Sequence, residues 1–225
     1  MYIKTNYSDI PEVFARVNII NYRLPPPNIP FLKVELLNLA GGIPDENFDH
    51  FNFRINVVSP QVFELKVDSS YHILTRTVDL IEMEINNDSF IVNEELRGRG
   101  LGTKILLNQI REAKRLNFLK LIIYAIGGHE YSEEFNGYSH WAKYGYEMFP
   151  YDQDRFEKEW SRYGLSTLRE LAQNPSYYKL WEVEGFSWSG MFKLNDPITL
   201  SFLKEYIQSL IDKGFIYELW PEVFG

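Results

Sequence analysis

The chain has 225 residues, of which 45% are hydrophobic and 24% charged, a composition typical of a globular protein with a sizeable core. The absence of cysteine excludes disulfides, a thiolate nucleophile and a cysteine metal site, and the net charge of −8 argues against a general nucleic-acid binder. No apolar run approaches the roughly 20 residues that span a bilayer, and the first residues lack the apolar core of a signal peptide, so we expect a cytoplasmic protein without a membrane partner.

The N-terminal part of the chain is predicted to contain short helices. Residues 9–20 have the pattern of a helix with a proline in its first turn. The proline-rich segment 24–30 then predicts an extended connector. Residues 31–39 form either a second short helix or a strand, which ends at two consecutive glycines. We therefore expect an N-terminal helical segment over residues 1–30.

From residue 51 the chain has the alternating apolar pattern of β-strands. In the longest of these strands the apolar positions change parity at Leu80 and Ile81, which predicts a β-bulge there. Residues 86–88 are either a tight turn or an interruption within one long strand. The predicted strands cover residues 51–59, 62–68, 73–85 and 90–93.

The second half of the chain is predicted to be richer in helices. After a glycine-containing loop, residues 101–116 have the pattern of an amphipathic helix. A continuous apolar run over 118–126 predicts a buried strand. The aromatic stretch 181–190 either lines an acceptor site or packs in the core. Further helices are predicted over residues 135–144, 153–172, 176–184 and 198–213, and a short strand over 146–150.

The loop over residues 95–104, ELRGRGLGTK, combines three alternate glycines with two arginines at the start of a helix. A helix N-terminus presents unsatisfied N–H groups and a partial positive charge, and glycines let a ligand approach the backbone closely. We therefore expect the loop to bind a phosphate group. The spacing of its glycines excludes both the P-loop motif and the G-x-G-x-x-G dinucleotide motif.

The charge of the chain is unevenly distributed around this loop. Residues 97–120 contain seven Lys or Arg and a single acidic residue, Glu112, so the segment carries +6 and leaves −14 for the remainder. A basic segment in an acidic chain suggests a local anion site, with an acidic surface left for a different, cationic partner.

The spacing Arg97-x-x-Gly100-x-Gly102 resembles the pyrophosphate-binding signature of the GNAT N-acetyltransferase superfamily. The strand over 118–126 stands where this family places its next strand, and the run from Trp141 to Tyr146 resembles a later helix that ends in Gly-Phe or Gly-Tyr. The resemblance implies an α/β fold with a mixed, mostly antiparallel central sheet, flanking helices and splayed central strands. We expect a single domain with a core over residues 31–150 and a helical C-terminal extension over 151–225 packed on that core.

In this family the loop amides hold the pyrophosphate of acetyl-CoA, and the pantetheine arm pairs with the preceding strand. The resemblance therefore implies acetyl-CoA as the co-substrate, and we expect no metal. The family often has a pantetheine-contacting asparagine where this chain has Glu134, and Asn136 is the nearby candidate. The implied cofactor-binding residues are Ile91, Val92, Asn93, Arg97, Gly98, Arg99, Gly100, Leu101, Gly102, Thr103 and Asn136.

The chemistry of the family is direct attack by an amine, which needs a base for the amine proton and an acid for the leaving thiolate. Glu82 and Glu84 share one parity of the predicted long strand and are the base candidates, with a raised pKa if partly buried; the alternative is a solvated strand face. The usual tyrosine acid is replaced here by Trp141, whose indole cannot supply a proton. Tyr138 and Tyr144, one helical turn to either side, either replace this acid or only pack.

The function that the resemblance implies is an acyl-CoA-dependent N-acyltransferase that moves acetyl from acetyl-CoA to a primary amine. Two alternatives stay open. One is a non-catalytic acyl-CoA-binding module that lost its acid at Trp141, and the other is an interaction protein whose helical C-terminal third does the work. The expected acceptor is a small-molecule or peptide amine, nucleic acid is the least favoured partner, and a homodimer is open.

Overall fold

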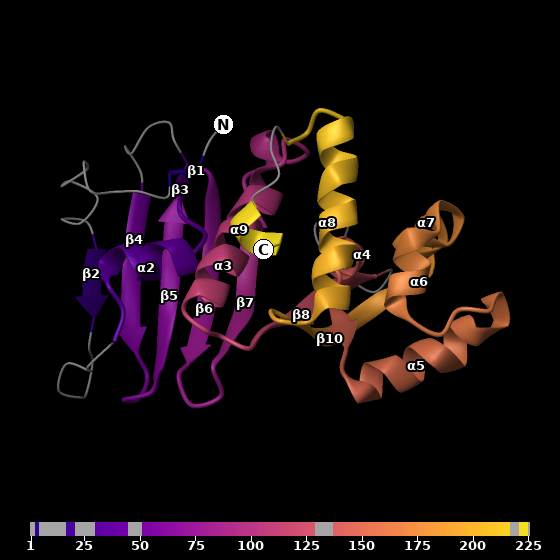
Figure 1. Cartoon of the computed structure of the whole chain (residues 1–225), viewed down its shortest axis with the longest axis horizontal. Helices are drawn as coiled ribbons and strands as arrows, with labels where there is room; N and C mark the ends of the chain where they lie inside the picture. The colour runs from indigo at the N-terminus through magenta and orange to yellow at the C-terminus, as the bar shows by residue number, and fades with distance from the viewer. Residues whose placement is uncertain are drawn as a thin grey trace. The chain divides into compact units, whose positions relative to one another are not determined.

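Figure 1 shows the computed structural model of the chain, which describes residues 3–4, 17–20, 30–44, 51–128, 137–216 and 221–224. The chain divides into two units, each of which is described by itself below. The first unit comprises Met1–Leu119 and Ile211–Gly225, and the second comprises Lys120–Leu210. These boundaries differ from the predicted one near residue 150, and the prediction of a single domain stays a prediction.

The first unit is built on an open sheet with the strand order β2-β4-β5-β6-β7. β2 runs parallel to β4, and the other neighbouring pairs are antiparallel. A separate antiparallel pair joins β1 (Ile3–Lys4) to β3 (Ile43–Pro44). The strands of the open sheet are β2 (Val17–Ile20), β4 (Phe51–Val57), β5 (Val62–Ser69), β6 (His72–Asp79) and β7 (Glu84–Val92).

Two helices, α2 (Lys33–Leu39) and α3 (Leu101–Arg115), lie on one face of this sheet (Figure 1). Alternate strand residues are buried, which is the pattern of a sheet with one covered face. Asn108 Nδ2 of α3 donates a hydrogen bond to Asn38 Oδ1 of α2 at 3.3 Å, which joins the two helices. The buried apolar strand residues are Phe51, Phe53, Ile55, Phe63, Leu65, Val67, Leu74, Val78 and Ile85.

The N-terminal prediction is wrong where the structure describes the segment. Residues 17–20 were expected to end a helix and instead form β2, which pairs with β4. Three of these four residues are Val or Ile, whose branched side chains favour strands, and the edge of β4 supplies backbone partners. Residues 9–16 of that predicted helix lie outside the described residues. The element over 31–39, which the sequence left open, is the helix α2.

The long strand predicted over residues 73–85 is also wrong, because residues 80–83 form a turn between β6 and β7. Asp79 Oδ1 accepts hydrogen bonds from the backbone N–H groups of Ile81 at 2.8 Å and Glu82 at 3.1 Å. Such a carboxylate mimics a backbone turn and closes the hairpin without a glycine or a proline. The change of apolar parity therefore marks a hairpin, with no β-bulge at this point.

A β-bulge does occur, but it lies farther along β7. Thr75 pairs with Ser89, whereas the next residue of β6, Arg76, pairs with Asn87, so Asp88 is the extra residue. The segment that was predicted as a turn or an interruption is therefore a bulged part of one continuous strand.

The second unit contains an antiparallel sheet with the strand order β8-β10-β9. Its middle strand, β10 (Phe186–Lys193), includes the second half of the aromatic stretch 181–190. Phe186, Trp188 and Phe192 alternate along this strand and are buried, so the interpretation of the stretch as core packing is confirmed. The outer strands are β8 (Lys120–Gly128) and β9 (Glu147–Met148).

Helices make up most of the second unit beyond residue 150, as predicted, but the single helix predicted over residues 153–172 is wrong. A 3₁₀ turn, Ser161–Tyr163, follows the first helix, and the left-handed Gly164, with φ of 75°, ends it before the next helix begins. α5 (Pro150–Trp160) and α7 (Pro175–Glu184) each begin with a proline, whose fixed φ suits the first helical position. Trp160 and Trp181 pack edge to face, with 5.3 Å between the ring centroids. The other helices are α4 (Gly137–Lys143), α6 (Leu168–Gln173) and α8 (Pro197–Asp212).

The described elements make the chain a mixed α/β protein whose strand pairs are mostly antiparallel, which confirms the predicted fold class. The predicted splay concerns β7 and β8, which belong to different units, and it stays a prediction. Among the residues described above, none of the helices has the length and apolar character needed to span a bilayer.

Candidate functional site

The candidate site is the loop between β7 and α3 in the first unit. Asn93, the first residue after β7, anchors the loop to the neighbouring turn: its backbone N–H donates to the carbonyl oxygen of Tyr71 at 2.9 Å, and its side-chain amide donates to that of Ser70 at 3.1 Å. Asn93 Oδ1 accepts a hydrogen bond from the N–H of Glu95 at 3.2 Å and so begins the short 3₁₀ turn Glu94–Leu96. The end of the strand is therefore fixed before the glycines begin.

Two glycines of the loop need the conformational freedom of glycine. Gly98 has φ of 73° and Gly100 has φ of 76°, both in the left-handed region that other residues rarely adopt. Gly100 caps α3, and its carbonyl oxygen accepts the first intrahelical hydrogen bond, from the N–H of Lys104 at 3.0 Å. The N–H groups of the first turn have no carbonyl partner within the helix. They face out of the helix end, where an anion binds well.

The three glycines differ in what surrounds them. A Cβ built on Gly100 would lie 2.6 Å from the carbonyl oxygen of Phe215. A Cβ on Gly102 would make ordinary contacts of 3.6 Å with the side chains of Phe90 and Val92. Around Gly98, no described atom lies within 4 Å of that position. The loop thus has one side packed against the chain itself and one side, at Gly98, that is open in the described structure.

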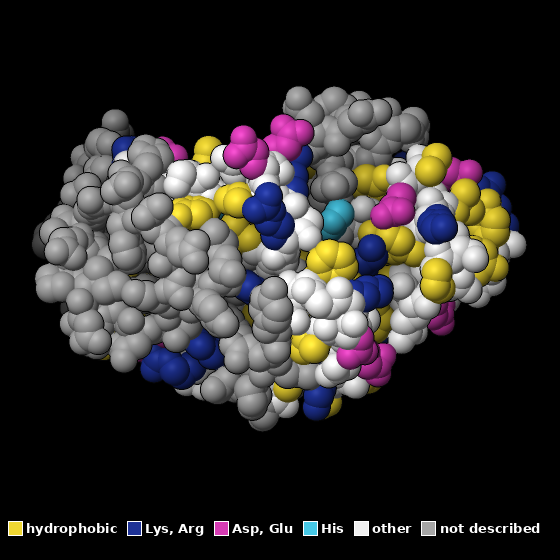
Figure 2. Space-filling view, turned by 90° about the horizontal axis from the view of Figure 1, so that it is seen from above, with side chains coloured by type: hydrophobic (Ala, Val, Ile, Leu, Met, Phe, Trp, Pro, Cys, Tyr) yellow, Lys and Arg dark blue, Asp and Glu magenta, His cyan; other side chains and the backbone are white. Residues whose placement is uncertain are grey.

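The two arginines of the loop are both exposed but are held differently. Arg97 Nε donates a hydrogen bond to the carbonyl oxygen of Val92 at 3.1 Å, which folds this side chain back onto the end of β7. For the side chain of Arg99, no hydrogen bond or ion pair is found among the described residues. Figure 2, seen from above, looks onto this end of the first unit and shows basic and acidic side chains on its described part. Arg99 is therefore the cation best placed to meet an incoming anion.

The basic segment 97–120 does not form a single anion-binding surface. Arg115, at the end of α3, donates hydrogen bonds to the carboxylates of Glu112 at 2.6 Å and Glu35, and these bonds raise its pKa. Lys114 donates to the carbonyl oxygen of Val223 at 2.7 Å, and burial lowers its pKa. These residues lie roughly 20 Å along the helix from the loop. Their charge serves packing and ion pairs within the unit.

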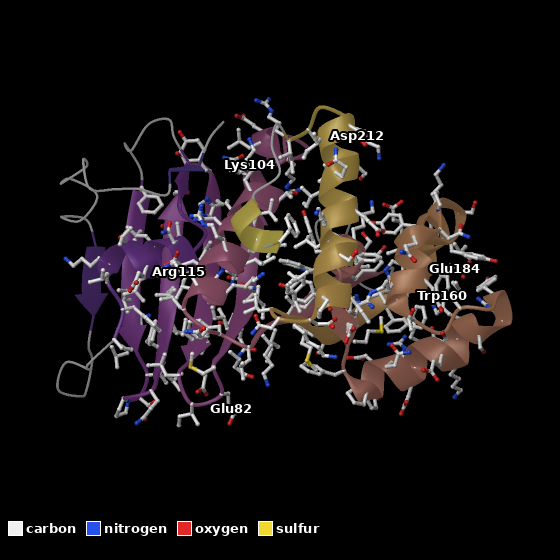
Figure 3. All side chains as sticks on the ribbon, viewed as in Figure 1. Glu82, Lys104, Arg115, Trp160, Glu184 and Asp212 are labelled. Atoms are coloured by element: carbon white, nitrogen blue, oxygen red, sulfur yellow. The ribbon has the colours of Figure 1, made fainter. Side chains whose placement is uncertain are left out.

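The structure does not bring the predicted base residues to the loop. Glu82 is exposed in the turn between β6 and β7, and Glu84 is the first residue of β7. Eight residues of extended strand separate Glu84 from Val92, which is roughly 26 Å. Figure 3 shows Glu82 and Lys104, a residue of the first turn of α3, at opposite ends of this unit.

The predicted acid Tyr138 has a structural role in the second unit. It is 6% exposed, and its hydroxyl donates a hydrogen bond to the backbone carbonyl of Glu182 at 2.6 Å. Burial and the charge of Glu182 raise its pKa, which holds the phenol in its protonated form. The indole N–H groups of Trp181 and Trp188 both donate to the backbone carbonyl of Tyr138, at 3.3 and 2.9 Å.

The other predicted acid, Tyr144, belongs to an aromatic cluster in the same unit. Its ring centroid lies 5.9 Å from that of Trp141 and 5.3 Å from that of Tyr206. Trp141 also packs edge to face on Tyr146, with 5.2 Å between centroids. Trp141, at the position where the resemblance implies an acid, is therefore a packing residue. Asn136 lies outside the described residues.

Several buried polar side chains on the sheet face that α3 covers were not predicted from the sequence. His72 is 1% exposed, its ring packs edge to face against Phe90, and burial together with the charge of Arg76 lowers its pKa to about 3. Gln109 Nε2 of α3 donates to Asn87 Oδ1 of β7 at 2.9 Å. The signal was present in the sequence, because His72 and Arg76 share the parity of the buried residues of β6.

Within the described ranges, no group of three His, Cys, Asp or Glu side chains is arranged to hold a metal ion. No protein-family model matches the chain, and a search of curated proteins finds no matching sequence. The resemblance to the acetyltransferases therefore rests on the spacing of the loop motif and on segments in the order strand, loop, helix and strand.

Proposed function

We propose that the chain is an acyl-CoA-dependent N-acyltransferase of the cytoplasm that transfers acetyl to a primary amine. The single observation that carries the proposal is the loop between β7 and α3. It has two left-handed glycines, an open side at Gly98 and an exposed arginine, Arg99, at the N-terminus of a 15-residue helix. This combination suits a diphosphate group, which needs close backbone amides together with a neutralising cation.

The residues of the loop fit the CoA moiety in type and position. The amides from Gly98 to Gly102 and the guanidinium of Arg99 would hold the pyrophosphate. The backbone of Ile91 to Asn93 would pair with pantetheine, and Ile91 is 46% exposed, so the end of β7 is accessible on that face. Acetyl-CoA supplies the activated acyl group when bound.

One residue remains a candidate for the acid of the reaction, and none remains for the base. Tyr138 already donates its hydroxyl hydrogen to the carbonyl of Glu182, so it is dropped as the donor to the leaving sulfur. Tyr144 remains a predicted donor because of the resemblance, although it packs on Trp141 and Tyr206. Glu82 and Glu84 lie at the far end of β7 from the loop, so the proposal assigns the amine proton to neither of them.

Release of free thiol from acetyl-CoA in the presence of primary amines tests this function. The panel would cover small polyamines, amino sugars, lysine-containing peptides and peptide N-termini. We expect at least one class to raise thiol release well above the rate without an acceptor, with one acetylated amine formed per thiol. If no amine in the panel raises thiol release, the proposed N-acyltransferase activity is contradicted.

A second candidate function is a non-catalytic CoA-binding module. The specific observation that favours it is the packing of two aromatic residues. Trp141 stands at the position of the family's acid, and Tyr138 lies one helical turn before it. This module would bind CoA at the same loop and release no thiol with any amine. Either function is compatible with a small-molecule or peptide amine as the partner. Either is also compatible with a homodimer.

A further inference from the structure

The chain returns to the first unit after α8 and contacts the glycine loop. Gly214, with φ of 75°, ends the helix, and its N–H donates to the carbonyl oxygen of Ile211 at 2.8 Å. The next residue, Phe215, places its carbonyl oxygen 2.6 Å from the Cβ position of Gly100. Ile216 is 2% exposed, and its Cγ1 lies 3.4 Å from the same position. This segment therefore packs directly on the residue that caps α3.

A second contact fixes the C-terminal segment at the other end of α3. Val223, in the short helix α9 (Pro221–Phe224), is fully buried, and its carbonyl oxygen accepts the hydrogen bond from Lys114 at 2.7 Å. Figure 1 shows α9 beside α3. Since Gly100 and Lys114 are about 21 Å apart along the helix, the two contacts can be altered separately.

We infer that residues 213–216 position the glycine loop and so set its affinity for a ligand that carries a pyrophosphate group. The part of the inference that concerns the ligand rests on the proposed function. The loop residues from Asn93 to Arg99 are mostly exposed, and the buried side chain of Ile216 holds the loop at Gly100. A loop held in its binding conformation before the ligand arrives binds more tightly, because less conformational entropy is lost on binding.

Amide hydrogen exchange in the ligand-free protein tests the positioning directly. In Ile216→Ala we expect the hydrogen-bonded amides at the two ends of the loop to exchange at least about tenfold faster than in the wild type, since local opening becomes easier. These are the N–H of Arg97, which donates to the carbonyl oxygen of Glu94, and the N–H of Lys104, which donates to that of Gly100. Val223→Ala is the matched control, because it removes buried methyl groups from the same C-terminal segment near Lys114. It should change exchange at the loop by less than about twofold. Ile216→Val, which keeps most of the contact, should restore slow exchange.

Calorimetric titration with CoA extends the test to the ligand. Ile216→Ala should bind CoA at least about tenfold more weakly than the wild type, and Val223→Ala should bind it equally well. Loop exchange that is unchanged in Ile216→Ala, or raised equally in both variants, would overturn the inference. If exchange accelerates only in Ile216→Ala while the wild type binds no CoA, the positioning is supported and the proposed function fails.

Discussion

Replacing Gly100 with alanine should lower the free energy of unfolding by about 3 kcal/mol, whereas the same change at Gly98 should lower it by about 1 kcal/mol. Both glycines have φ near +75°, so both variants carry the strain of a left-handed non-glycine residue. Only the new Cβ at Gly100 meets a backbone atom, the carbonyl oxygen of Phe215 at 2.6 Å. The difference between the two variants therefore measures the contact with the C-terminal segment.

Gly102→Ala completes the comparison and predicts the opposite sign. This residue lies in the first turn of α3, and its new methyl group would only touch Phe90 and Val92 at 3.6 Å. Alanine favours the helix over glycine, so this variant should be about 0.5 kcal/mol more stable than the wild type. Urea unfolding of all three variants checks the series. Equal losses in Gly98→Ala and Gly100→Ala would show that Phe215 does not restrict Gly100.

Acidification from pH 7.5 to pH 5 should cost the protein about 2 kcal/mol of unfolding free energy through His72 alone. The pKa of His72 is about 3 in the folded protein against an ordinary value of 6.5. Above pH 6.5 the imidazole is neutral in both states. As the pH falls below that value the unfolded chain takes up a proton and the folded chain does not, so stability is lost between about pH 6.5 and pH 3.

The variant His72→Phe isolates this contribution, because a phenyl ring does not titrate and can keep the packing on Phe90. The loss of stability between pH 7.5 and pH 5, measured by urea unfolding, should be about 2 kcal/mol smaller in this variant than in the wild type. An identical pH dependence in wild type and His72→Phe would refute the assignment.

The regular elements follow from patterns that a sequence displays by itself. The amphipathic period of α3 and the continuous apolar run of β8 predicted both elements to within a few residues. β10 also carries a clear signal, since Phe186, Trp188 and Phe192 alternate, but the stretch was interpreted only as core packing or as the wall of an acceptor site and not as a strand. The turn over 80–83 escaped prediction because the carboxylate of Asp79, and not a glycine or proline, closes it.

The parts of the site that could not be predicted depend on contacts between distant residues. Gly100 and Phe215 are far apart along the chain, and no periodic pattern links them. The hydroxyl of Tyr138 binds a backbone carbonyl, that of Glu182, and every residue has such a group whatever its side chain. The loop itself, in contrast, could be predicted from its glycines. The backbone is left-handed at Gly98 and Gly100, and glycine adopts that conformation far more readily than other residues.

The claim that the loop binds the pyrophosphate of CoA is tested most directly by calorimetric titration of CoA into the wild type, Gly98→Asn and Gly98→Asp. Asparagine and aspartate both tolerate a left-handed backbone and have the same shape, so the two variants differ by one negative charge on the open side of the loop. We predict that the wild type and Gly98→Asn both bind CoA, and that Gly98→Asp binds it at least about tenfold more weakly than Gly98→Asn, because its carboxylate repels the phosphates. Absence of binding to the wild type at millimolar CoA, or equal affinities of the two variants, would contradict the account.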